Sequence, residues 1–231
     1  ADILDIGACS TRPGSTPVNK DEELARLRRG LDIICKKTSP IPLSVDTFRS
    51  DVAETVLREY PVSIINDISG LQDEQMAQVV AVSSAVYILT YNDKIRRDNA
   101  VVDAVGWFSL KLACLRQCGV KDVVLDPGFG FNKTIQENYY LLSHLRELEV
   151  LGCPILCGVS RKSMFYKPLG LTPNDVLAAT LTGQAVALQK GCNIIRVHDV
   201  AEAKQQIFVN CKLCSPHSDE GRNLNNNEVR S

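Results

Sequence analysis

Short apolar runs alternate with longer helical segments along most of this 231-residue chain. The apolar runs predict β-strands at 2–6, 43–46, 62–67, 86–90, 122–126, 154–158 and 193–197. Between them we expect helices at 20–37, 49–60, 73–82, 98–118, 135–150, 173–190 and 201–209. Regular alternation of strand and helix with short connections predicts a parallel sheet.

Several of the expected helices carry start and stop signals. Asn19 precedes Asp21, Glu22 and Glu23, which places a cap and three carboxylates at the positive end of a helix. The run 172–175, Thr-Pro-Asn-Asp, predicts a cap followed by Pro at the first helical position. Gly119 and Gly191 stand where helices are expected to end.

Six of the strands end in polar clusters, and this arrangement is typical of a (β/α)8 barrel, the TIM barrel, with its site at the C-terminal ends of the strands. Seven strands are identifiable and a closed barrel needs eight. The chain begins inside a strand, so we expect that a first strand and its loop precede Ala1. We assign 1–210 to the barrel domain and 211–231 to a polar, disordered tail, because 216–231 has almost no apolar residues.

Composition narrows the possible functions. The chain is 45% hydrophobic and 23% charged with a formal net charge of −1, so broad nucleic-acid binding has no electrostatic support. No apolar run reaches transmembrane length and no secretory signal is visible, so we expect a cytoplasmic protein without a membrane segment. Nine scattered cysteines favour buried thiols in a reducing compartment. Cys211, Cys214 and His217 have the spacing of a partial zinc site, but no fourth ligand is evident.

Two polar side chains at strand ends have the donors and acceptors of a ligand site. Asp126 ends a buried strand, where a carboxylate is costly unless it is paired, and it suits a heteroaromatic ring with adjacent N–H and amino donors. Asn66, with one acceptor and two donors, suits a mixed polar edge. The alternative is that both cap the next helix. Asp46 is open to the same two interpretations, ligand contact or, with Thr47, an N-cap.

Arg12, Arg196 and His198 form a possible anion-binding group. Arg196 and His198 alternate along a strand and share one face, so with Arg12 they suit a phosphate or pyrophosphate. The alternative for Arg196 is a structural ion pair with Asp199.

Further candidates follow the strands near 126 and 158. Lys162 can donate to a carbonyl or ring nitrogen, and Ser163 can open a helix whose N-terminus attracts a carboxylate. Gly128, Gly130 and Phe131 indicate a mobile loop with an aromatic wall. Tyr87, Leu89 and Tyr91 alternate on one strand and are interpreted as core or pocket wall.

Taken together, these clusters resemble the dihydropteroate synthase family of pterin-binding barrels. The motifs STRPG, SVDT, NDISG, DPGFGF, GVSRKS and RVHDV occur in the family's order between Ala1 and about Val209. The resemblance implies condensation of 6-hydroxymethyl-7,8-dihydropterin pyrophosphate with p-aminobenzoate to dihydropteroate in folate biosynthesis. It also implies competition by sulfonamides, Mg²⁺ as cofactor and a homodimer.

Residue roles follow from the same motifs. The resemblance implies that Asp126, Asn66 and Lys162 hold the pterin, with Asp46 beside the ring. It likewise implies that the pyrophosphate is held by Arg12, Arg196 and His198, and that the aminobenzoate site is lined by Thr11, Pro13, Phe131 and Ser163. Asp46, Lys162, Arg196 and His198 are the predicted catalytic residues.

The chain departs from the family at two places. The expected metal ligand, an Asn on the family's first strand, is absent, so the metal site is unknown. Where many members have Met-His-Met, this chain has Leu89-Thr90-Tyr91, and we assign Leu89 to the pocket. Two rival functions remain: a methyl-folate methyltransferase, and a non-catalytic pterin-binding relative.

Overall fold

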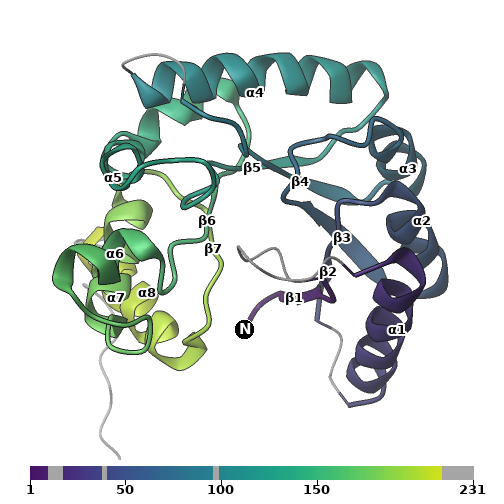
Figure 1. Cartoon of the computed structure of the whole chain (residues 1–231), viewed down its shortest axis with the longest axis horizontal. Helices are drawn as coiled ribbons and strands as arrows, with labels where there is room; N and C mark the ends of the chain where they lie inside the picture. The colour runs from purple at the N-terminus through teal and green to yellow at the C-terminus, as the bar shows by residue number, and fades with distance from the viewer. Residues whose placement is uncertain (10–17, 38–40, 96–98, 215–231) are drawn as a thin grey trace, which may run out of the picture.

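The computed structural model describes residues 1–9, 18–37, 41–95 and 99–214, and it has helices packed outside an inner set of strands (Figure 1). In this part of the chain seven strands follow one another, and every paired strand runs parallel to its partner. They are β1 (Leu4–Gly7), β2 (Leu43–Asp46), β3 (Val62–Asp67), β4 (Val86–Thr90), β5 (Val123–Asp126), β6 (Leu156–Cys157) and β7 (Ile194–Ile195).

Hydrogen bonding divides the strands into a sheet β1-β2-β3-β4-β5 and a pair β6-β7. A parallel bridge between Leu125 and Ile155 joins the two. No ladder joins β7 to β1 among the described residues; instead Arg196 contacts Asp5 and Lys204 contacts Asp2. The prediction of an α/β barrel with seven identifiable strands is confirmed.

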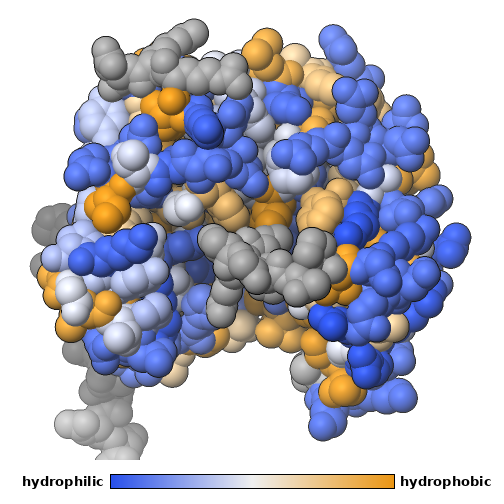
Figure 2. All heavy atoms as spheres, in the orientation of Figure 1, coloured by the Kyte–Doolittle hydropathy of each residue, from blue (hydrophilic) through white to orange (hydrophobic). Residues whose placement is uncertain are grey.

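The helices form the outer layer. They are α1 (Lys20–Lys37), α2 (Ser50–Glu59), α3 (Gln75–Ser83), α4 (Ala100–Gln117), α5 (Ile135–Ser143), the 3₁₀ helix η1 (Leu145–Leu151), α6 (Ser163–Leu169), α7 (Leu177–Gln189) and α8 (Val200–Cys214). Hydrophilic residues cover the outward face of α1 and α2 (Figure 2). As expected, Asn19 Oδ1 accepts the Glu22 amide at 2.9 Å at the start of α1. No described helix is long and apolar enough to cross a membrane.

Two expectations for the last third of the chain need correction. Thr172 does not start a helix; it hydrogen-bonds the Asp175 carboxylate in a turn, and α7 begins only at Leu177. The hydroxyl and the amide of Thr172 both use the same acceptor, which closes the turn locally. Helix α8 continues to Cys214, past the boundary expected at 210, and residues 215–231 lie outside the described part.

The strands separate two apolar regions of different size. The larger lies between strands and helices and includes Val45, Ile65, Leu89 and Leu125. The smaller, which we call the apolar layer, consists of Ile64, Ile88, Val124 and Leu156, with Ile3, Val86 and Ile194 packed against it. Its members come from both ends of the strand order, so this layer fills the inside of the barrel.

Candidate active site

Polar side chains occupy the next inward position above the apolar layer. Because side chains alternate along a strand, the residue two positions after each inward apolar residue also faces inward. Two positions after an inward apolar residue, each of five strands or strand ends thus carries a polar one: Asp5 after Ile3, Asn66 after Ile64, Thr90 after Ile88, Asp126 after Val124 and Arg196 after Ile194. With Asp46, which is in register with Asn66, these residues form what we call the polar layer. It lies at the C-terminal ends of the strands, where barrel enzymes place their sites.

Asp5 joins two predicted site residues. Its Oδ2 accepts hydrogen bonds from Arg196 Nε at 2.6 Å and from Asn66 Nδ2 at 3.1 Å. Arg196 Nη2 also lies 3.5 Å from Asp46 Oδ2. Sequence reasoning missed Asp5, although a carboxylate inside the apolar run 2–6 was the available signal. Asp5 therefore holds the predicted pterin-binding amide and the predicted pyrophosphate-binding guanidinium in one network.

The structure decides the alternatives left open for these side chains. Arg196 does not pair with Asp199, because Asp199 is bound by Arg161 at 2.7 and 3.0 Å. Helix α2 has Arg49 at its N-cap, without a side-chain cap bond, so Asp46 does not cap it. Asn66 and Asp126 cap no helix either; Asp126 Oδ1 accepts the Gly128 amide at 2.8 Å.

Several buried polar atoms facing the barrel interior have no hydrogen-bond partner among the described residues. They are Asp5 Oδ1, Ser44 Oγ, Asn66 Oδ1 and Thr90 Oγ1. A buried polar atom without a partner destabilises the fold by about 1–3 kcal/mol, so native proteins rarely leave four together unless water or a ligand pairs with them. The polar layer has the hydrogen-bonding capacity that a polar ligand needs.

Burial sets the charge states of this layer. Burial, followed by the neighbouring Asp5 carboxylate, raises the pKa of Asp46 to about 7, while Arg196 opposes the shift. Burial also raises the pKa of Asp126, against the Gly128 amide and the Lys162 ammonium. The pKa of Lys162 is lowered, again chiefly by burial. Ionisable groups with shifted pKa values in one cluster are typical of a functional site.

Lys162 lies at the edge of the polar layer beside the loop after β5. Its Nζ is 4.9 Å from the centre of the Phe131 ring, and a Cβ on Gly130 would lie 3.3 Å from its Cδ. Ser163 is the first residue of α6, as predicted. Lys133 holds this loop by donating to three backbone carbonyls, those of Tyr91, Gly128 and Phe131. Lys162 therefore lies against Phe131, whose loop is fixed to the protein by Lys133.

The prediction for Leu89 is wrong. Leu89 is fully buried in the core between strands and helices, in register with Leu125, so it does not line the barrel interior. Tyr87 and Tyr91 share that face, and Tyr91 packs against Trp107 and Phe108 of α4. The inward residues of β4 are Ile88 and Thr90 because inward and outward positions alternate.

His198 is exposed at the same end of the barrel and contacts Ser160. Its ring nitrogen Nδ1 lies 3.0 Å from Ser160 Oγ, which also accepts the His198 backbone amide at 3.3 Å. Thr11, Arg12, Pro13 and His217 lie outside the described residues.

The described residues do not form a metal site by themselves. No group of three His, Cys, Asp or Glu side chains gathers in the part of the chain that the structure describes. Asp5 and Asp46 offer oxygens of the type that Mg²⁺ prefers, but Arg196 already pairs with both carboxylates. A Mg²⁺ ion here needs most of its ligands from substrate phosphates and water.

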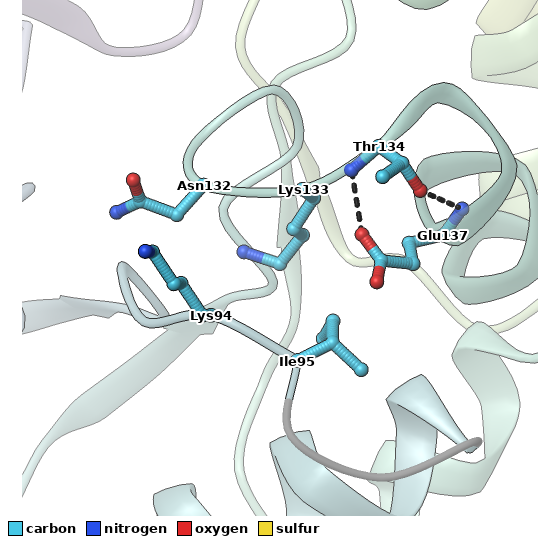
Figure 3. Close-up of a pocket in the computed structure, with 6 residues that line it drawn as sticks. All are labelled: Lys94, Ile95, Asn132, Lys133, Thr134 and Glu137. Atoms are coloured by element: carbon cyan, nitrogen blue, oxygen red, sulfur yellow. Dashed lines mark hydrogen bonds between the residues drawn. The ribbon is translucent and has the colours of Figure 1, made fainter.

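A shallow depression of about 470 Å³ lies beside the site, on the loops after β4 and β5. Its lining includes Lys94, Asn132 and Lys133 and the capping box of α5, Thr134 and Glu137 (Figure 3). The Lys133 ammonium donates to backbone carbonyls, and the Glu137 carboxylate accepts the Thr134 amide. These two charged groups are thus used within the protein, unlike the buried atoms of the polar layer that have no partner among the described residues.

Comparison with known proteins agrees with this geometry. Residues 1–198 match the family model described as pterin binding enzyme. The dihydropteroate synthase of Clostridium beijerinckii is 37% identical over 207 residues, covering 87% of this chain and 76% of that protein. A probable bifunctional folylpolyglutamate synthase/dihydropteroate synthase of Haloferax volcanii is 36% identical over 211 residues, and the chain spans 25% of its length.

Solved structures agree in fold. The dihydropteroate synthase of Clostridium difficile, determined in the presence of pteroic acid, superposes with a TM-score of 0.88 at 36% identity, over 92% of this chain and 82% of that one. The Yersinia pestis enzyme in a sulfonamide drug complex gives a TM-score of 0.88 at 31% identity, over 93% and 81%. The chain therefore belongs to the pterin binding enzyme family and, within it, to the dihydropteroate synthases, which are transferases of folate biosynthesis.

Proposed function

We propose that this chain condenses 6-hydroxymethyl-7,8-dihydropterin pyrophosphate with p-aminobenzoate, giving 7,8-dihydropteroate and pyrophosphate. One observation carries the proposal: the polar layer has buried atoms without a partner among the described residues, and its member Arg196 has a side chain that is 45% exposed. A flat polar heterocycle suits the buried part, and an anion suits the exposed part.

The pterin ring is assigned to Asp126, Asn66 and Lys162. Asp126 Oδ2, opposite the oxygen that accepts the Gly128 amide, and the open Asn66 Oδ1 are acceptors for ring N–H and amino groups. The Lys162 ammonium supplies a donor from the other side. Burial strengthens each of these bonds because water does not compete for them.

The pyrophosphate is assigned to Arg196 and His198, with Arg12 as a further predicted contact. Arg196 is held by Asp5 through Nε and its Nη2 lies 3.5 Å from Asp46 Oδ2, while its side chain remains 45% exposed. A planar guanidinium held at one edge is well suited to bind phosphate oxygens with the other.

The chemistry requires charge stabilisation more than acid–base catalysis. The bond between the methylene carbon and the pyrophosphate oxygen breaks, and its electron pair leaves with the anion. Positive charge then develops on the methylene and ring, near the Asp46 and Asp126 carboxylates, while Arg196 and His198 receive the anion. The neutral arylamine attacks the methylene carbon and afterwards loses a proton to water. No residue needs to act as a nucleophile.

The p-aminobenzoate is assigned to Phe131 and Ser163, together with Thr11 and Pro13. Phe131 offers a ring face beside Lys162, and Ser163 begins α6. The sulfonamide complex of the Yersinia pestis relative supports competition by sulfonamides at this site.

Three further points belong to the proposal. A Mg²⁺ ion would supply positive charge to the pyrophosphate oxygens, so we expect pyrophosphate affinity to depend on the metal. A homodimer is expected, and Phe208, Val209 and Leu213 on α8, each more than half exposed, are available to such an interface. A cytoplasmic location agrees with the free thiols of the cysteines that the structure describes.

The testing experiment follows pyrophosphate release from the pterin substrate with Mg²⁺, with and without p-aminobenzoate, and adds a sulfonamide. We expect release that depends on p-aminobenzoate and is inhibited competitively by the sulfonamide. Pterin binding without any release would contradict the proposal and favour the non-catalytic relative. Release insensitive to a sulfonamide would contradict the assignment of the aminobenzoate site.

A further inference from the structure

Ser160 makes two contacts with a single residue, His198. It follows β6 and is 6% exposed, whereas His198 is exposed at the mouth of the barrel. Ser160 Oγ lies 3.3 Å from the His198 backbone nitrogen and 3.0 Å from the ring nitrogen Nδ1. Neither contact is local, since the two residues are 38 positions apart in the chain.

Counting hydrogens settles the direction of these bonds. The backbone N–H of His198 can only donate, so Ser160 Oγ accepts there. The hydroxyl still carries its own hydrogen, and within the described residues the structure offers Ser160 Oγ no acceptor other than His198 Nδ1. If Nδ1 carried the ring proton, the buried hydroxyl hydrogen would remain unpaired, at a cost comparable to a lost hydrogen bond.

We infer that Ser160 is a positioning residue that fixes the tautomer of His198. Its hydroxyl donates to Nδ1, so the neutral imidazole carries its proton on Nε2. The proton on one ring nitrogen is set by the bond that the other makes, and the orientation of the ring is set with it. Nε2–H is then a donor with fixed direction for a phosphate oxygen of the leaving group.

The surrounding charges allow this arrangement. Asp199, next to His198 in the chain, is bound through both carboxylate oxygens by Arg161, so Ser160 rather than Asp199 is the partner of Nδ1. The Arg161 backbone amide donates to Thr180 Oγ1 at 3.1 Å, which anchors the segment that carries Ser160. The inference about the tautomer rests on geometry alone, and only its consequence for pyrophosphate rests on the proposed function.

The tautomer can be read directly by ¹⁵N NMR of histidine-labelled protein at about pH 8, where an ordinary imidazole is neutral. The chain holds three histidines, so a His198→Gln variant assigns the signal. We expect the Nε2–H tautomer in the wild type, a mixture in Ser160→Ala, and recovery of the single tautomer in Ser160→Thr. An Nδ1–H tautomer in the wild type would overturn the inference, whether or not the variants fold.

Calorimetry with inorganic pyrophosphate and Mg²⁺ tests the consequence. We expect Ser160→Ala to weaken pyrophosphate binding by about three- to tenfold, the size of one net hydrogen bond, and Ser160→Thr to restore it. Ser109→Ala, which removes an exposed serine of α4, is the control and leaves the affinity unchanged. Equal affinity in Ser160→Ala and wild type would contradict the positioning role. A wild type that binds no pyrophosphate would contradict the proposed function, while the tautomer result stands separately.

Discussion

Two layers of side chains inside the same barrel lie two residues apart along each strand. The apolar layer, Ile64, Ile88, Val124 and Leu156, is buried and closely packed. The polar layer directly above it holds three carboxylates, an amide, a hydroxyl and a guanidinium, with partnerless buried atoms on three of its residues. Burial therefore has opposite consequences in the two layers: it stabilises the fold in the apolar layer, and in the polar layer it leaves polar groups that a ligand can pair with.

The division assigns stability to one layer and recognition to the other. Truncating a side chain of the apolar layer should reduce the free energy of unfolding and leave ligand affinity intact. Removing a charged group of the polar layer should abolish ligand affinity. It should leave the free energy of unfolding unchanged or increased, since active sites often sacrifice stability for function. Variants that fail to separate in this way would show that the two layers act as one unit.

The largest effect is expected for Asp126→Ala. The carboxylate offers two charge-assisted hydrogen bonds to the pterin, each worth about 1.5–3 kcal/mol, so we expect pterin affinity to fall at least about 100-fold. The unfolding midpoint should not fall. Burial raises the pKa of this carboxyl, which indicates that the buried carboxylate destabilises the folded state. Calorimetric titration with 6-hydroxymethylpterin measures the affinity. Asp122→Ala, at an exposed neighbouring position, is the control, and equal affinities for both variants would refute the assignment.

Ile64→Ala tests the apolar layer. Truncating a buried isoleucine typically lowers the free energy of unfolding by about 2–5 kcal/mol, and the same loss is expected here. Pterin affinity of the folded protein should stay near that of the wild type. Denaturant unfolding measures the free energy of unfolding, and calorimetry measures pterin affinity. The control is Val82→Ala, at a position on α3 that is 89% exposed. A large loss of affinity would mean that the layers are not separable.

Asp46→Asn should stabilise the protein above neutral pH while it reduces turnover. The pKa of Asp46 is raised from 3.8 to about 7, so between these values the folded state binds more protons than the unfolded state. Its stability therefore falls as pH rises through this range, by at most roughly 4 kcal/mol at about 1.4 kcal/mol per pKa unit. The Asn variant lacks this slope. Unfolding curves at about pH 5 and 8 measure it, and parallel pH profiles for both proteins would contradict the raised pKa.

Arg196→Ala should give the smallest change, confined to one half of the substrate. Loss of a charged hydrogen bond predicts pyrophosphate binding weaker by roughly 10- to 100-fold, with affinity for the bare pterin retained. Arg58→Ala, on the exposed end of α2, is the control. If both ligands weaken equally, Arg196 acts through its bonds to Asp5 and Asp46 as a structural residue.

The fold was predictable because each strand is an apolar run of its own. The residues at the strand ends could be assigned from the motifs, and Asp46, Asn66, Asp126 and Arg196 meet in one layer. Leu89 was misassigned because one strand read alone does not show which of its faces is inward. The register Leu89–Leu125 and Thr90–Asp126 decides it, and register is a tertiary property.

Two other misses have local causes. Asp5 was overlooked because its role depends on Arg196, 191 positions away, and no local spacing predicts such a contact. Thr172 carries a cap signal, yet its bonds to Asp175 close a turn instead of a helix. Short polar side chains serve both purposes, and the surrounding chain decides between them.

A crystal structure of the protein with bound 6-hydroxymethylpterin tests the central claim most directly. The account predicts the ring above Ile64 and Val124, with its N–H and amino groups on the Asp126 carboxylate and its polar edge on Asn66. The exocyclic methylene should point toward Arg196. A ring bound in the depression lined by Lys94 and Glu137, with the polar layer left without it, would contradict the account.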